Sequence, residues 1–110
     1  MVTWPAIIKH SNDPELTYIR SQAEWNTDAG LHDIDYDESD YLVDSTGKVF
    51  SLCTVNNSIE LKSKGSTMLL NDFLGLVKAH AAQKGSCCVA KLFAPTFEDA
   101  FKIIESLEET

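Results

Sequence analysis

The sequence predicts an α+β fold: a mostly antiparallel sheet of about five to six strands, with two amphipathic helices packed on one face. Two observations support this class. Short β-type segments separated by turn residues fill most of residues 1–62, and the two longest helical patterns follow later in the chain. Runs of strands followed by helices are typical of α+β domains. With 110 residues, 44% of them hydrophobic, we expect a single globular domain over residues 1–110.

The predicted strands are short and are separated by turn residues. The first two form a hairpin around the turn at residues 11–14, and Gly47 supplies the positive φ that a second tight hairpin needs. Asn56, Asn57 and Ser58 form the next turn. The strand segments are 4–10, 15–20, 41–44, 48–55 and 59–62.

Helices are predicted from apolar spacing and from capping residues. Ser21 and Glu24 have the spacing of a capping box for a short helix over 21–28, which turns Trp25 toward the core. A longer helix is predicted over 71–84 and a final one after Pro95. The apolar segment 87–94 between them predicts an inner strand buried on both faces.

The net charge of −8 is concentrated in the first part of the chain. Residues 1–44 contain ten acidic and two basic residues, whereas residues 45–110 contain seven of each. Binding to nucleic acid requires Lys and Arg side chains that replace phosphate counterions, so the composition argues against a nucleic-acid partner. The same deficit argues against anionic membranes, and no segment is apolar for long enough to span a bilayer. Without a secretory leader pattern, we expect a cytoplasmic protein.

Thiol chemistry is one candidate activity. The three cysteines have no framework spacing, which is typical of reduced intracellular thiols. Cys87 or Cys88 could act as a nucleophile if His80 lay close enough to lower the thiol pKa. The other interpretation is that the thiols pack in the core. The alternative function is therefore a small thiol-dependent enzyme or ligand-binding domain.

A divalent-metal site in the acidic segment 33–44 is a third possibility. Asp33, Asp35 and Asp37 alternate like the first ligands of a calcium loop. Glu38 stands where such a loop needs glycine, and Asp44 stands where it uses a bidentate glutamate. These departures argue for a solvated acidic loop, and we expect no cofactor.

The leading functional hypothesis is a small acidic interaction or regulatory domain without catalysis. Its partner would be another protein or a second copy of the chain, because no set of catalytic residues is evident and acidic residues lie beside aromatic ones. The candidate contact residues are Trp25, Asp33, Asp35, Tyr36, Asp37, Asp40 and Tyr41.

Three segments of the sequence are similar to a known family. They are residues 4–9 (WPAIIK), 36–50 (YDESDYLVDSTGKVF) and 77–91 (VKAHAAQKGSCCVAK). Together they resemble a small family of bacterial proteins, chiefly from marine gammaproteobacteria, that is classed as a domain of unknown function. The resemblance implies a stand-alone bacterial cytosolic domain. It implies no activity, ligand or catalytic residue.

Overall fold

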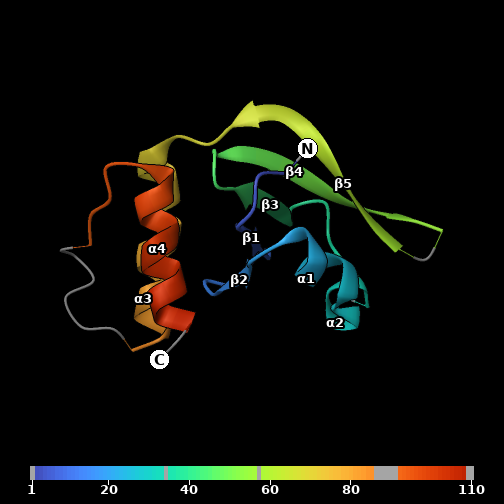
Figure 1. The fold of residues 1–110 in the computed structure, drawn as a ribbon, viewed down its shortest axis with the longest axis horizontal. Coiled ribbons are helices and arrows are strands. Elements are labelled where there is room, and N and C mark those ends of the chain that lie inside the picture. The colour runs from blue at the N-terminus through green and yellow to red at the C-terminus, as the bar shows by residue number, and fades with distance from the viewer. Residues whose placement is uncertain (1, 34, 57, 86–91, 109–110) are drawn as a thin grey trace.

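The computed structural model describes residues 2–33, 35–56, 58–85 and 92–108. Within these ranges the chain forms five strands and four helices (Figure 1). In chain order they are β1 (Ala6–Lys9), β2 (Leu16–Ile19), α1 (Gln22–Thr27), α2 (Ala29–His32), β3 (Tyr41–Asp44), β4 (Lys48–Val55), β5 (Ser58–Thr67), α3 (Leu70–Gln83) and α4 (Phe97–Glu108).

The five strands form one antiparallel sheet in the order β2-β1-β3-β4-β5. The long β1–β3 connection contains β2, α1 and α2, and β1 lies between β2 and β3, one strand in from the edge of the sheet. The register between β4 and β5 is irregular near Gly65, which has a φ of +71°, and β5 curves strongly in Figure 1. The predicted α+β class with an antiparallel sheet is confirmed.

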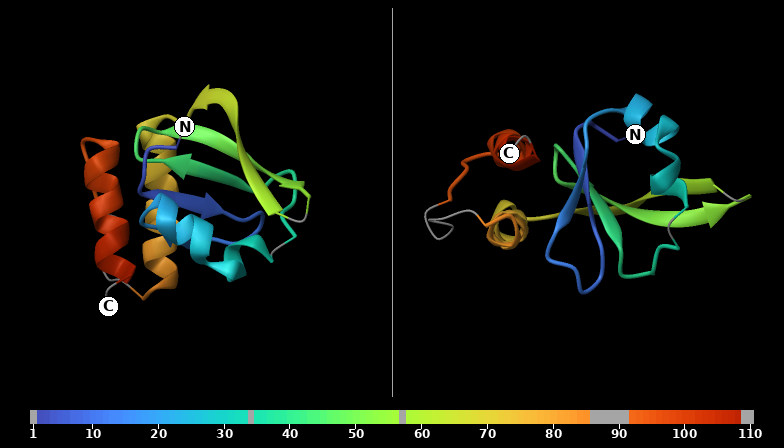
Figure 2. Two further views of the ribbon diagram at one scale, coloured as in Figure 1. Left: turned by 45° about the vertical axis from the view of Figure 1, so that its right-hand side comes forward. Right: turned by 90° about the horizontal axis from the view of Figure 1, so that it is seen from below.

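Helices cover both faces of the sheet. Figure 2 shows α3 and α4 side by side on one side of the sheet and α1 and α2 on the other. Ile7 and Val43 point toward α3 and α4, where they join Phe73 and Phe101 in the first core. The neighbouring strand residues alternate to the opposite face. The second core, beneath α1 and α2, consists of Ala6, Ile8, Ile19, Trp25, Leu31, Leu42, Phe50, Leu52 and Ile59.

Local sequence signals explain several element boundaries. The hydroxyl of Ser21 accepts a hydrogen bond from the Glu24 N–H at the start of α1, as the capping-box pattern predicts. Thr96 caps α4 in the same way, accepting from the Asp99 N–H. Gly47, with a φ of +87°, forms the tight turn between β3 and β4.

Other element predictions need correction. The predicted inner strand over 87–94 lies largely outside the described residues, and residues 92–94 form no strand. Phe93 there is 74% exposed, so this side chain is not in the core as an inner strand requires. The short helix α2 was not predicted; the Asp28 side chain caps it by accepting from the Gly30 N–H. β5 extends to Thr67, beyond the predicted end at residue 62.

A histidine side chain accepts a backbone hydrogen bond at each edge of the sheet. At the β2 edge, the Leu16 N–H donates to His80 Nδ1 over 2.9 Å. At the β5 edge, the Ile59 N–H donates to His32 Nδ1 over 3.4 Å, and His32 Nε2 lies 2.8 Å from the Trp25 carbonyl oxygen. Edge strands leave such groups unpaired, so each ring satisfies one of them.

Candidate binding site

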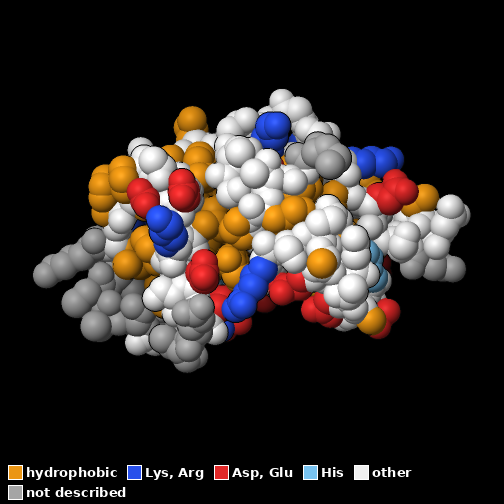
Figure 3. All heavy atoms as spheres, viewed as in Figure 1, with side chains coloured by type: hydrophobic (Ala, Val, Ile, Leu, Met, Phe, Trp, Pro, Cys, Tyr) orange, Lys and Arg blue, Asp and Glu red, His pale blue; other side chains and the backbone are white. Residues whose placement is uncertain are grey.

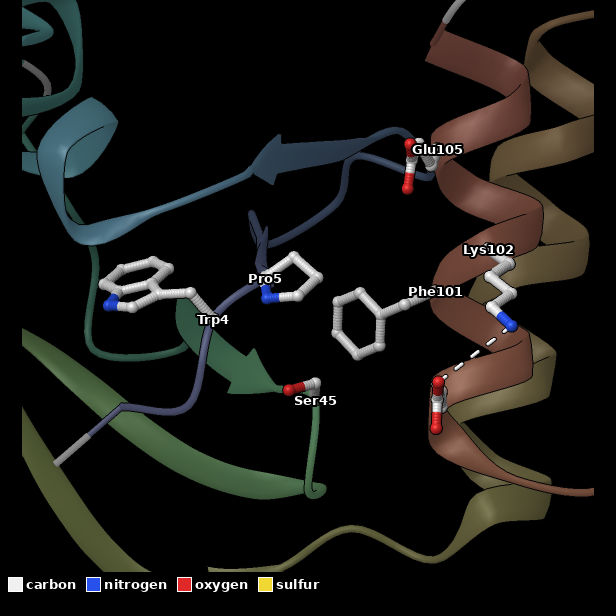
Figure 4. Close-up of a pocket in the computed structure, with 7 residues that line it drawn as sticks. Trp4, Pro5, Ser45, Phe101, Lys102 and Glu105 are labelled. Atoms are coloured by element: carbon white, nitrogen blue, oxygen red, sulfur yellow. Dashed lines mark ion pairs between the residues drawn. The ribbon is translucent and has the colours of Figure 1, made fainter.

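A groove of about 370 Å³ lies between helix α4 and the start of β1. Trp4, Pro5 and Ser45 form the side next to the sheet. The α4 side consists of Glu98, Phe101, Lys102 and Glu105. Figure 4 shows the Phe101 ring extending from α4 toward Pro5, with Ser45 nearby. In Figure 3, hydrophobic side chains are visible in the hollow between α4 and α1.

The bottom of the groove is apolar and firmly held. The Phe101 ring is 3% exposed and stacks on Phe73 at 5.1 Å between ring centres, within the first core. The Trp4 indole N–H donates to the Gln22 side chain over 3.1 Å. Because these rings are already held in place, a partner that packs on the partly exposed Trp4 and Pro5 would order few additional side chains. The groove can therefore receive an apolar group without rearranging its lining.

The rim of the groove carries opposite charges. Glu98 and Lys102 form an exposed ion pair of 3.9 Å one helical turn apart on α4. Glu105 lies two turns after Glu98 and makes no ion pair with any described residue. Burial, and next the negative charge of Glu105, raise the pKa of the Tyr18 hydroxyl. Glu105 thus interacts with the Tyr18 hydroxyl, and it is the carboxylate at the rim that has no ion pair among the described residues.

Asp44 holds the sheet side of the groove together. This carboxylate is fully buried and accepts hydrogen bonds from the N–H groups of Thr3, Thr46 and Lys48 at 2.9–3.0 Å. Burial alone would raise its pKa, but these donors and the Thr46 hydroxyl hold the pKa of Asp44 below its ordinary value. The charged carboxylate therefore fixes Thr3, and with it the adjoining Trp4, against the β3–β4 turn.

The acidic segment lies outside this groove. Asp33, Asp35 and Asp37 are exposed, and Tyr36 is half-buried with its hydroxyl donating to the Leu31 carbonyl oxygen. Figure 3 shows acidic side chains gathered along the lower edge of this face, beneath α1 and α2. These three carboxylates are accessible to a partner.

Three of the candidate contact residues have other contacts. Trp25 is 4% exposed in the second core, and Asp40 is 6% exposed. Asp40 accepts from the N–H groups of Ser11 and Asp37, at 2.6 and 2.8 Å. Although burial opposes it, these donors and the nearby His10 lower the pKa of Asp40. Tyr41 is half-buried, with the Lys64 ammonium 6.0 Å from its ring centre.

The residues of the two alternative hypotheses are only partly described. Cys87 and Cys88 lie outside the described residues, while the His80 ring is 1% exposed and accepts the Leu16 N–H. In the described part of the acidic segment, Asp40 and Asp44 serve as acceptors for backbone N–H groups. No group of three or more potential metal ligands clusters among the described residues.

The groove itself was missed by sequence analysis. Residues 4 and 101 are 97 positions apart, and neither belongs to a recognisable binding motif. One weak signal was available. Glu98, Lys102 and Glu105 have the spacing that places them on one face of α4, a helix predicted from its apolar stripe. That pattern is equally typical of a solvated helix face.

Comparison with known proteins identifies the family. A family model, DUF4144, described as a protein structure with unknown function, matches residues 4–104. The chain therefore belongs to this family, and the predicted resemblance is confirmed.

A solved NMR structure of a protein from Shewanella amazonensis shares the fold. It is 24% identical, with a TM-score of 0.70, and the match covers 96% of this chain and 90% of that one. Among curated proteins no match is found. None of the helices in the described ranges has the length and apolarity needed to cross a bilayer.

Proposed function

We propose that this protein is a non-catalytic binding domain whose groove beside α4 receives a basic, apolar segment of another protein. The observation that carries the proposal is the groove of about 370 Å³, with Trp4, Pro5 and Phe101 as apolar lining and Glu105 at its rim. Concave apolar sites with a few placed polar groups are the usual form of a binding site.

The charges of the groove support a cationic partner. Lys102 is paired with Glu98, so the Glu105 carboxylate, which has the neutral Tyr18 hydroxyl beside it and no ion pair among the described residues, would receive an incoming Arg or Lys. The formal charge of the whole chain, −8, attracts the same kind of partner over longer distances. An apolar side chain next to the cation would fill the space above Phe101 and Pro5.

The polar groups of the groove support binding more than catalysis. The Ser45 hydroxyl donates to the Thr3 carbonyl oxygen over 2.8 Å, so it is engaged in the turn. A serine nucleophile needs a base within hydrogen-bond reach, and the groove lining contains no histidine. Carboxylates, one ammonium group and aromatic rings together suit recognition of a charged, apolar segment.

The proposal is tested with a short peptide in which Arg and Leu alternate. We expect Glu105→Gln to weaken its binding about tenfold, because one charge-assisted hydrogen bond is lost. Glu60→Gln is the matched control, since it removes the same charge from β5, outside the groove. Affinity is measured by calorimetry, and amide NMR shifts of Trp4 and Phe101 locate the peptide.

A peptide with Gln in place of Arg distinguishes charge recognition from apolar binding. The proposal requires this peptide to bind more weakly than the Arg peptide. Equal affinity for both peptides, equal effects of Glu105→Gln and Glu60→Gln, or no shift at Trp4 and Phe101 would each reject it.

A further inference from the structure

The outer edge of β5 carries backbone groups without a partner strand. β5 is the last strand of the sheet, and among the described residues only β4 pairs with it. The Ile59 N–H points away from β4, to His32, while the Lys62 carbonyl oxygen points toward β4 and accepts from the Ser51 hydroxyl. Because the direction alternates along a strand, the N–H and C=O groups of Leu61 and Ser63 point outward.

The part of the β5 edge that is free to pair is limited at both ends. His32 occupies the edge at Ile59, and the strand bends at Gly65, whose N–H donates to the Ser63 hydroxyl. Within the described residues, no hydrogen bond joins the outward N–H groups of Leu61 and Ser63 to another group. The edge can therefore pair with a short segment only.

A second groove, of about 360 Å³, adjoins the open stretch. It lies between α1 and the β4–β5 hairpin, on the side of the sheet that Leu61 and Ser63 face. Trp25, Phe50 and Ile59 supply apolar lining, together with Leu61. A strand added to β5 would place alternate side chains over this groove.

The opposite face of the same stretch carries two lysines and one acidic residue, Glu60, which lies toward the closed end at Ile59. Lys62 and Lys64 are exposed, and Lys62 forms no ion pair with any described residue. In a paired strand, the residue directly opposite Lys62 lies on the same face, with the two Cβ atoms about 5 Å apart. An acidic side chain at that position would be attracted to Lys62.

We propose that the β5 edge at Leu61 and Ser63 is a second binding site, which accepts an extended segment of a partner protein with alternating apolar and acidic residues. The apolar residues enter the groove beside Trp25, and the acidic residue between them faces Lys62. Main-chain hydrogen bonds to Leu61 and Ser63 hold the segment in register. This site shares no residue with the groove beside α4.

A second copy of β5 is a poorer occupant of this edge. Symmetric antiparallel pairing centred on Lys62 would place two Lys62 side chains opposite each other, and pairing centred on Ser63 would place Lys62 opposite Lys64. Pairing centred on Leu61 would place Glu60 opposite Lys62, which is favourable, but it would bring Ser63 of one copy against the Ile59 position, which His32 occupies. Like charges directly opposite destabilise a sheet, so charge disfavours the first two registers and the contact of His32 with Ile59 obstructs the third.

The test uses a short peptide that alternates Ile and Glu, with one that alternates Ile and Lys as its counterpart. Binding of the first should shift the amide signals of Leu61 and Ser63 and slow their hydrogen exchange. Ser63→Pro removes the outward N–H and should weaken binding about tenfold. Ser63→Ala keeps this N–H but removes the hydroxyl that accepts the Gly65 N–H, so its loss of affinity should be clearly smaller than that of Ser63→Pro.

A second variant keeps the backbone intact. Lys62→Glu changes only an exposed side chain, and it should reverse the preference between the Glu and Lys peptides. The inference is overturned if the Ile–Glu peptide does not bind, if the shifts appear at Trp4 and Phe101 instead, or if Lys62→Glu leaves the preference unchanged. Failure of Glu105→Gln to affect the Arg–Leu peptide would reject only the first site.

Discussion

The surroundings of the buried His80 ring determine its protonation state. Its Nδ1 accepts the Leu16 N–H, so the proton of the neutral ring resides on Nε2, 3.6 Å from a Glu108 carboxylate oxygen. Burial is the largest influence and lowers the pKa of His80; the positive charge of Lys84 acts in the same direction, while Glu108 and Glu15 oppose it. The fold therefore favours the neutral ring.

This preference predicts a pH dependence of stability. The ordinary pKa of histidine is 6.5, and the pKa of His80 is lower in the folded protein. Between these two values the unfolded chain binds more protons, so the free energy of unfolding falls as the pH drops below 6.5. His80→Gln, which keeps an acceptor for Leu16 but does not titrate, should flatten this slope. The check is urea unfolding from pH 7.5 to about 5; an unchanged slope would assign it to another group.

At the residue scale, the sequence pattern indicates the burial of His80 but not that of Asp40 and Asp44. His80 shares the apolar stripe of α3 with Phe73 and Val77, a position typical of a histidine in or near the core, and it is 1% exposed. Asp40 and Asp44 resembled their acidic neighbours in the sequence, and only the folded turns show which backbone N–H groups they accept. Burial of a carboxylate depends on donors that become adjacent only upon folding.

At the scale of elements, the β3–β4 turn and α4 are packed together through Gly47. A Cβ atom at this position would lie 2.7 Å from the Phe97 ring, and the φ of +87° is unfavourable for other residues. Because Phe97 begins α4 and Ser45 lines the groove, this contact also sets one end of the candidate binding site.

Gly47→Ala should therefore destabilise the protein by about 2 kcal/mol, through both steric overlap and backbone strain. Gly65→Ala is the control, because its φ is +71° but no atom lies within 4 Å of the added Cβ. Thermal unfolding of both variants separates the two effects. If the losses are equal, the contact with Phe97 contributes nothing.

Elements were predictable wherever one local rule decided them. Capping by Ser21, the turn at Gly47 and the apolar spacing of α3 and α4 each depend on neighbouring residues. The extent of β5 was not predictable, because residues 63–67 are exposed and polar. Their strand conformation depends on pairing with β4, including the contact between Thr67 and Lys48.

At the scale of the whole molecule, the two proposed binding sites and the acidic segment have different physical roles. The groove beside α4 joins residues from opposite ends of the sequence, so no local pattern could predict it. The charge asymmetry, by contrast, was evident from composition alone. Long-range attraction accelerates encounter, whereas close contacts in a groove determine how long a partner stays bound.

Removing exposed charges from the acidic segment should therefore slow association with a basic partner. The double variant Asp33→Asn/Asp35→Asn is expected to lower the association rate of the Arg–Leu peptide and to reduce its dependence on salt, with little change in dissociation. Stopped-flow measurements at several salt concentrations test this. A faster dissociation with an unchanged association rate would show that these residues make direct contacts.

The two edge strands of the sheet, β2 and β5, differ in whether another strand can pair with them. At β2, helices α3 and α4 pack against the strand and His80 takes up the Leu16 N–H, while at β5 a few backbone groups remain free. An additional strand is therefore expected to pair at the β5 edge and not at the β2 edge. A strand added at β2 would have to displace α3 and α4, so edge pairing at β5 favours complexes of fixed stoichiometry over fibres.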